Sequence, residues 1–152
     1  MLKNIALFDM DGTLCNYDDA IIRDYNSLRS PEDPDYSHDL PFDYLIKRVD
    51  LIKQQQGWCL SLEKLQLGFD ILNNAVKIGF EPYILTQGPR VCPNAWGEKL
   101  QWVDKHIPGC KVTVTRDKGL TYGSFLVDDY PDYILRWLDC WPNQKTIMPV
   151  NK

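Results

Sequence analysis

The sequence contains no apolar run of the roughly 20 residues that a membrane-spanning helix needs. Its N-terminal apolar run is short and ends in an acid, so the pattern of a secretory signal peptide is missing. An excess of positive charge is missing too. The formal net charge is −4, which provides no electrostatic footprint for a nucleic-acid backbone. We therefore expect a cytoplasmic protein without membrane contact and without a stable nucleic-acid partner.

The cysteines are not arranged for crosslinking or for zinc binding. There are five of them, an odd number, and no two have the C-x-x-C spacing, which argues against a disulfide framework and a zinc site. We expect mostly buried thiols in a reducing compartment at Cys15, Cys59, Cys92, Cys110 and Cys140.

Length and composition indicate an ordinary globular domain. The chain has 152 residues, of which 44% are hydrophobic and 25% are charged. A chain of this size buries roughly two-thirds of its unfolded surface, so it can form a core without disulfides. We therefore predict one domain over residues 1–152.

Short apolar runs recur along the chain and end at polar residues or turns. Such runs are typical of buried parallel strands, and they occupy residues 5–8, 83–86, 112–115, 125–128 and, more weakly, 145–148. Helical patterns lie between them at residues 62–78, 96–106 and 130–138. This alternation predicts an α/β fold, a doubly wound parallel sheet of about five strands with helices on both faces.

Reactive side chains follow the predicted strands. Ligands of such sheets bind outside the carboxyl ends of the strands. In this sequence those ends carry Asp9, Thr86, Thr115, Arg116, Asp128 and Asp129. The residue types therefore agree with the place where the fold rule puts a site.

One segment is longer than a single crossover requires. Between the first strand and the helix at 62–78 there is room for two helices and a loop, Ser30–Pro41, rich in Pro and Asp. We interpret residues 15–60 as a small helical cap inserted over the strand ends, because long insertions are often functional. A decorated surface loop is the alternative.

The motif Asp9-Met10-Asp11-Gly12-Thr13 carries the strongest chemical signal. Two carboxylates just past a strand can converge on one ion, and Gly12 permits a sharp turn. Mg²⁺ prefers oxygen ligands and would keep Asp9 ionised beside a substrate phosphate. Asp9 could then attack phosphorus to form an aspartyl-phosphate, with Asp11 as general acid and base. The alternative is a turn with an acidic cap.

This motif resembles the first motif of the haloacid dehalogenase superfamily of phosphatases. The later superfamily motifs are matched in order by Thr86, Lys118 and the pair Asp128-Asp129. The resemblance implies that Thr86 and Lys118 bind phosphate. It also implies that Mg²⁺ is held by Asp9, the Asp11 backbone carbonyl and Asp129, with Asp128 behind them. Taken singly, each later residue has an ordinary structural explanation.

The second half of the chain resembles the 5′(3′)-deoxyribonucleotidase family more closely. The matching segments are G-E-K at 97–99, W-V-D at 102–104, T-R-D-K at 115–118 and V-D-D at 127–129. The resemblance implies a Mg²⁺-dependent phosphatase of nucleoside monophosphates. It also implies which residues bind the substrate, including its phosphate. They are Asp11, Tyr17, Thr86, Gln87, Lys99, Arg116 and Lys118. Gln87 stands where the family has a small hydroxyl residue.

Several questions stay open at this level. Trp58 could stack on a base or belong to the core, whereas Trp102, Trp137, Trp141 and His106 are expected to pack. A polynucleotide 3′-phosphatase, a phosphatase of small metabolites and a binding protein that kept only the fold are the competing functions. The base preference lies in the insertion, and a homodimer is compatible with the sequence.

Overall fold

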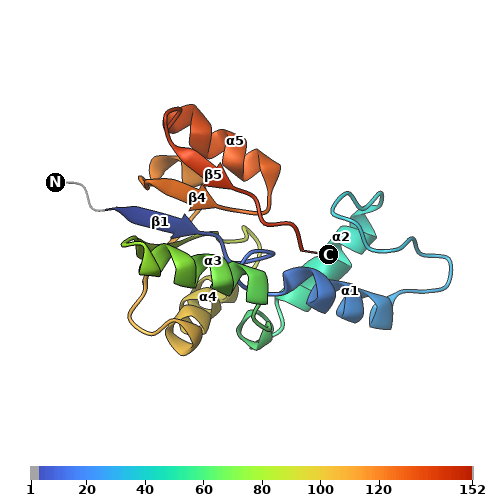
Figure 1. The fold of residues 1–152 in the computed structure, drawn as a ribbon. Coiled ribbons are helices and arrows are strands. Elements are labelled where there is room, and N and C mark those ends of the chain that lie inside the picture. Colours follow the sequence, from blue (N-terminus) through green and yellow to red (C-terminus); the bar gives the residue numbers. More distant parts are fainter. Residues whose placement is uncertain (1–3, 152) are drawn as a thin grey trace.

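The computed structural model describes residues 4–151, so residues 1–3 and 152 of the predicted domain lie outside the description. Figure 1 shows a sheet with helices on both sides. All strand pairs are parallel, and the strand order is β3-β2-β1-β4-β5. The strands are β1 (Ile5–Phe8), β2 (Glu81–Gln87), β3 (Lys111–Thr115), β4 (Phe125–Val127) and β5 (Lys145–Ile147). The predicted doubly wound α/β fold is therefore confirmed.

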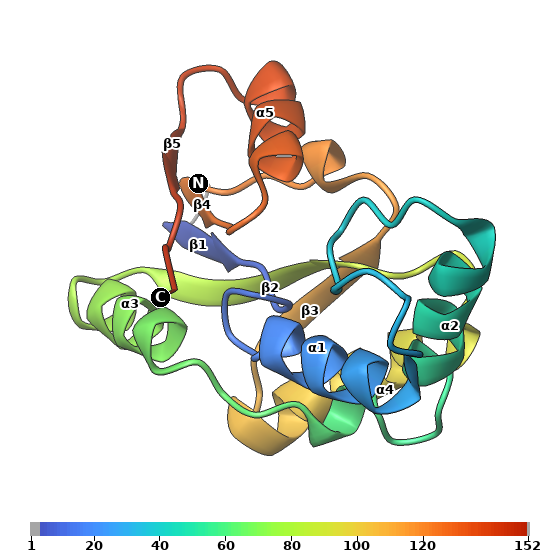
Figure 2. The same ribbon diagram turned by 90° about the vertical axis from the view of Figure 1, so that its right-hand side faces the viewer.

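Alternation along β1 divides the core between the two faces of the sheet. Ala6 and Phe8 belong to the larger apolar cluster, which also receives buried residues of α3 (Gln66–Lys77) and α4 (Pro93–His106). Leu7 points to the opposite face and packs with Trp137 of α5 (Pro131–Cys140). Figure 2 accordingly shows α5 on one side of the sheet and α3 and α4 on the other.

The strand register brings the ends of β1 and β4 to the same level, while β2 continues three residues further. Phe8 pairs with Ile84 of β2 on one side and with Val127 of β4 on the other. The backbone N–H of Asp9 continues the pairing and donates to the Val127 carbonyl at 2.9 Å. Asp9 and Asp128 therefore leave neighbouring strands side by side.

The predicted helix at 62–78 begins later, at Gln66. Its first residues instead pair with the segment after β1: the Leu65 N–H donates to the Leu14 carbonyl, and Cys15 forms an antiparallel bridge with Lys64. Backbone groups used in that pairing cannot take part in a helix. The helices predicted at 96–106 and 130–138 are present as α4 and α5, with slightly different bounds.

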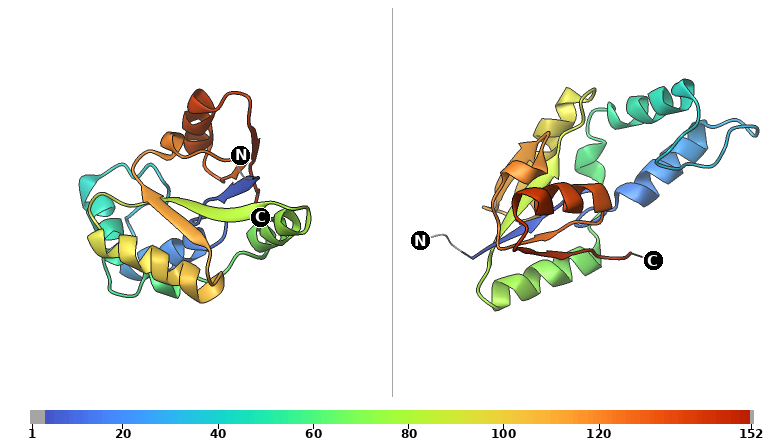
Figure 3. Two further views of the ribbon diagram at one scale, coloured as in Figure 1. Left: turned by 90° about the vertical axis from the view of Figure 1, so that its left-hand side faces the viewer. Right: turned by 90° about the horizontal axis from the view of Figure 1, so that it is seen from above.

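The insertion contains two helices, α1 (Tyr17–Leu28) and α2 (Asp43–Lys53), followed by a short 3₁₀ turn, η1 (Cys59–Ser61). Figures 1 and 3 show α1 and α2 beyond the carboxyl ends of the strands. The loop between the two helices is held by Asp33, which accepts hydrogen bonds from Tyr44 (2.8 Å) and Arg48 (2.6 Å) of α2. The Arg48 guanidinium therefore holds the pKa of Asp33 well below its usual range.

All five cysteines are free, and Cys15, Cys59 and Cys92 are buried. Trp102 and Trp137 are fully buried, as expected of packing residues. The His106 ring packs against Trp102 with 4.4 Å between centroids. Within residues 4–151, no helix has the length and apolar character needed to cross a membrane.

Candidate active site

The turn after β1 is built around Gly12. The N–H groups of Thr13, Leu14 and Cys15 all donate to the Met10 carbonyl, at 2.8 to 3.0 Å. Gly12 has φ +80°, a conformation that L side chains rarely adopt. A β-carbon at this position would also lie 2.1 Å from Asp129 Oδ2. Glycine therefore permits both the turn and the close approach of Asp129.

Lys118 lies fully buried between two carboxylates. Its ammonium donates to Asp9 Oδ1 at 2.7 Å and to Asp128 Oδ2 at 2.6 Å, and it sits 4.4 Å from the centroid of the Tyr133 ring. Burial alone would lower the pKa of Lys118, but the charges of Asp9 and Asp128 outweigh it and the pKa is raised. The lysine is therefore held as a cation beside Asp9.

Three carboxylates form a cluster that suits a hard cation. One oxygen each from Asp9, Asp128 and Asp129 can be chosen so that all lie within 4.8 Å of one another. Burial and the neighbouring charge of Asp9 raise the pKa of Asp128, and the same two effects raise the pKa of Asp129 to about 7. A divalent cation would relieve this repulsion, and carboxylate oxygens are ligands that Mg²⁺ prefers.

The Asp11 carboxylate lies outside that cluster. It accepts from Lys99 Nζ at 2.7 Å, and the same ammonium donates to Thr86 Oγ1 at 3.2 Å. The Cys15 thiol donates to the other Asp11 oxygen at 3.3 Å. Burial favours a higher pKa for Asp11, but the Lys99 charge outweighs it and the pKa is lowered. The Asp11 carboxylate is therefore engaged with Lys99 and takes no part in the acidic cluster.

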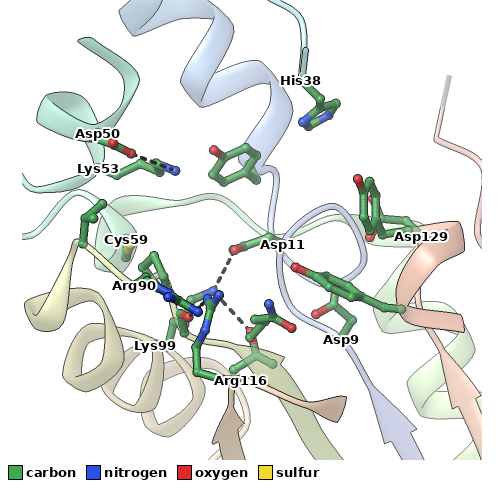
Figure 4. A pocket seen from close by; sticks show the side chains of 18 of the residues that line it. Asp9, Asp11, His38, Asp50, Lys53, Cys59, Arg90, Lys99, Arg116 and Asp129 are labelled. Atoms are coloured by element: carbon green, nitrogen blue, oxygen red, sulfur yellow. Dashed lines mark hydrogen bonds and ion pairs between the residues drawn. The ribbon is translucent and has the colours of Figure 1, made fainter. Parts of the chain in front are cut away.

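A cavity of about 440 Å³ connects these groups. Figure 4 shows Asp9, Asp11, Lys99, Arg116 and Asp129 around it. The predicted site residues that line it are Asp9, Asp11, Tyr17, Thr86, Gln87, Lys99, Arg116 and Asp129. Lys118 and Asp128 stand behind the lining: Lys118 contacts Asp9, and Asp128 contacts Lys118. Side chains from far-apart segments thus meet in one place.

The insertion forms the far wall of the cavity. Tyr17 and Trp58 meet edge to face, with 5.7 Å between ring centroids, and both line the cavity. Trp58 is only 7% exposed, and its indole N–H donates to Asp24 at 2.7 Å. Trp58 is therefore a packed residue whose ring also reaches the site. Stacking of Trp58 on a base stays a prediction.

Sequence reasoning missed several lining residues. One of them is His38, in the loop between α1 and α2. Its ring centroid lies 6.5 Å from that of Tyr130, and its Nε2 lies 3.7 Å from Asp18 Oδ1. No local pattern marks a histidine in an irregular loop. Arg90, in the loop after β2, also lines the cavity. Its place just after a strand end was the available signal.

In a comparison with known families, residues 3–139 match the family described as 5′ nucleotidase, deoxy (pyrimidine), cytosolic type C protein. Among solved structures, one similar protein is described as a haloacid dehalogenase-like hydrolase from Burkholderia xenovorans LB400. It shares 15% sequence identity with this chain, with a TM-score of 0.53, over 95% of this chain and 81% of that chain. At this identity the likeness shows a common fold. No curated protein sequence matches the chain significantly.

Proposed function

Because the chain belongs to the family of cytosolic type C deoxy (pyrimidine) 5′-nucleotidases and is a phosphatase, we propose that it hydrolyses nucleoside monophosphates through an aspartyl-phosphate on Asp9. The observation that carries this proposal is the setting of Asp9. Its carboxylate is paired with the buried Lys118, and Asp11 lines the same cavity. This is a nucleophile with a charge-balancing cation and a second carboxyl for proton transfer.

In the first step an Asp9 oxygen attacks phosphorus, and the bond between phosphorus and the ester oxygen breaks. Asp11 gives a proton to the departing sugar oxygen. In the second step Asp11 takes a proton from a water molecule, whose oxygen attacks the phosphorus. The bond between Asp9 and phosphorus then breaks and inorganic phosphate leaves. Asp11 thus ends each cycle in the protonation state in which it began.

Lys99 links substrate arrival to the state of Asp11. In the structure its ammonium is shared between Asp11 and Thr86 and lowers the pKa of Asp11. A bound phosphate dianion draws Lys99 toward its own oxygens and adds negative charge next to Asp11. Both changes raise the pKa of Asp11, so it can hold the proton that the leaving group needs.

The acidic cluster supports a Mg²⁺ requirement. Asp9 and Asp129 would hold the ion, with Asp128 behind them, bonded to Lys118 and the Tyr130 N–H. The Asp11 backbone carbonyl is the further ligand that the family resemblance implies. When bound, Mg²⁺ would neutralise charge on the phosphate and keep Asp9 ionised. Thr13 and the Tyr130 N–H orient the cluster, because they donate to Asp129 (3.3 Å) and Asp128 (3.0 Å).

We also propose that α1, α2 and the loop between them act as the cap over the site. Tyr17, Trp58 and His38 come from this segment and line the cavity. A nucleoside attached to the reacting phosphate would occupy this side.

The family to which the chain belongs is described as cytosolic, which supports a cytoplasmic location for this chain.

The test is a phosphate-release assay with Mg²⁺ on deoxy- and ribonucleoside monophosphates beside sugar phosphates. We expect nucleotides to be hydrolysed, Asp9→Asn to abolish turnover with the fold intact, and EDTA to abolish it reversibly. Asp104→Asn, which alters an exposed carboxylate on α4, serves as the matched control. Activity on sugar phosphates alone would overturn the substrate class, and substantial activity in Asp9→Asn would overturn the nucleophile.

A further inference from the structure

A second hollow adjoins the candidate active site. It measures about 510 Å³, and its lining is Pro89, Arg90, Pro93, Trp96 and Arg116. Pro89, Arg90 and Arg116 also line the active-site cavity, so the two spaces share one wall. Arg116 follows β3, which is the edge strand of the sheet, and Asp9 follows the central strand β1. The second hollow therefore lies to the side of the reacting centre.

Most cations around the two cavities are neutralised by carboxylates. Lys99 pairs with Asp11 at 2.7 Å, and Lys53 lies 3.6 Å from Asp50. Lys118 is held by its two carboxylates. These pairings leave little charge for a further anion.

The two arginines on the shared wall differ from these lysines. Arg116 Nη1 donates to the neutral Gly88 carbonyl at 2.6 Å. Arg90 is exposed and has no hydrogen bond or ion pair within residues 4–151. No acidic residue belongs to the lining of the second hollow. In Figure 4 both guanidinium groups lie on the side of the cavity that Lys99 occupies. The shared wall therefore carries positive charge that no carboxylate neutralises.

The backbone that carries these arginines is well supported. The Gly88 N–H donates to the Thr115 carbonyl at 3.1 Å, so that the loops after β2 and β3 are joined. The Trp96 indole N–H donates to the Pro89 carbonyl at 2.9 Å. Its ring covers Gly88 so closely that a β-carbon there would lie 2.2 Å from the ring. The loop that carries Arg90 is thus held in place before any ligand binds.

We infer that the wall formed by Arg90 and Arg116 binds a second phosphate group of the substrate, as in a nucleoside 3′,5′-bisphosphate. This inference rests on the proposed nucleotidase function. Across the sheet β3 lies two strand spacings from β1, about 10 Å, and it also extends three residues further, since Phe8 pairs with Ile84 and Thr115 with Gln87. Arg90 and Arg116 nevertheless line the same cavity as Asp9, so a nucleoside with two phosphates in that cavity can contact both Asp9 and the wall. Planar guanidinium groups suit phosphate oxygens, because they can donate two parallel hydrogen bonds. One phosphate reacts at Asp9 while the other stays bound at the wall.

The experiment compares kcat/KM for a deoxynucleoside 5′-monophosphate and the corresponding 3′,5′-bisphosphate, both with Mg²⁺. We expect wild-type protein to favour the bisphosphate by about tenfold, the effect of one charge-assisted hydrogen bond. Arg90→Gln should remove most of this preference, mainly by raising KM for the bisphosphate. Lys105→Gln is the matched control, because it removes an exposed cation of α4 that lines neither cavity. It should leave the ratio of the two substrates unchanged.

Outcomes for the two proposals are separable. If neither nucleotide is hydrolysed, the proposed function fails. If the monophosphate is hydrolysed but wild type and Arg90→Gln show the same substrate ratio, the second phosphate site is overturned.

Thermal unfolding of Arg90→Gln checks its fold. Arg90→Lys, which keeps the charge but loses the planar fork, should retain part of the preference. A binding titration of both nucleotides on Asp9→Asn gives a readout independent of turnover, and equal affinities would also overturn the site.

Discussion

At the scale of single residues, the site consists of acids held close together by buried lysines. Lys118 has no exposed side-chain surface and joins Asp9 to Asp128, and Lys99 joins Asp11 to Thr86. Desolvating such charges is expensive, and the pairing offsets that cost only while every partner is present. Loss of one lysine therefore has consequences for both catalysis and stability.

Replacing Lys118 with Met tests this arrangement. The change leaves Asp9 and Asp128 buried without their cation, so we expect a loss of about 3–5 kcal/mol in the free energy of unfolding without metal. Turnover should fall by about 10²–10³-fold or more, because charge balance on the transferring phosphate is lost. Denaturant unfolding in EDTA and phosphate release measure the two effects. Lys99→Met should destabilise less, because the Asp11 carboxylate is 36% exposed. An unchanged free energy of unfolding in Lys118→Met would contradict a stabilising role for the buried contacts of Lys118 with Asp9 and Asp128.

At the scale of elements, three features position the site. They are the turn between β1 and α1, the end of β2 and the end of β4. The turn is tight because Gly12 has a positive φ, and Asp129 occupies the space that a side chain would need. The register of β1 with β4 then brings Asp9 beside Asp128. The geometry of the acidic cluster thus depends on local backbone conformation as well as on carboxylate chemistry.

Gly12→Ala should therefore damage both stability and metal binding. The substitution adds backbone strain and places a methyl group 2.1 Å from an Asp129 oxygen. Gly79→Ala is the matched control, because Gly79 also has a positive φ (+97°) but nothing within 4 Å of the added carbon. We expect Gly79→Ala to cost about 1–2 kcal/mol from strain alone. Gly12→Ala should cost more and should weaken the stabilisation of the protein by Mg²⁺. Equal effects of Mg²⁺ on both variants would contradict this.

At the scale of the whole molecule, the site sits where the two faces of the sheet meet the insertion. Each face of the sheet has its own apolar cluster, and the strands separate the two clusters. The acids lie just beyond the carboxyl ends of β1 and β4. Folding brings one oxygen each of Asp9, Asp128 and Asp129 within 4.8 Å of one another. Global stability should therefore respond to both pH and Mg²⁺.

The direction of the pH effect follows from the raised pKa of Asp129. Burial and the charge of Asp9 raise this pKa from 3.8 to about 7, so the folded protein keeps a proton that the unfolded chain has released between these values. Without metal, this group's contribution to stability should be greatest at low pH and fall as the pH rises through the window.

Thermal unfolding in EDTA at several pH values, with wild type and Asp129→Asn, isolates the effect. The difference in Tm between the two proteins should shift in favour of Asp129→Asn as the pH rises. At pH 7, Mg²⁺ should raise the Tm of wild type by mass action and that of Asp129→Asn less. A pH-independent difference, or equal Mg²⁺ shifts, would argue against the cation site.

Much of the fold follows from local patterns in the sequence. The five strands and the three helices of the core were predicted because short apolar runs and helical periodicity are properties of neighbouring residues. The start of α3 was predicted four residues too early. Leu62 and Leu65 fit the apolar pattern, but backbone pairing between Lys64 and Cys15 competes with the helix. Such competition comes from a segment about 50 residues away and leaves no local trace.

The sequence by itself determined the class of fold, the two aspartates after the first strand and, through the family match, the kind of enzyme. Only the tertiary structure decided which cation pairs with which acid. Lys118 meets Asp9 across 109 residues, and Lys99 meets Asp11 across 88. It also placed Arg90 and His38 at the cavity. The physical reason is that periodicity acts within one element, whereas strand order and register decide which strand ends become neighbours.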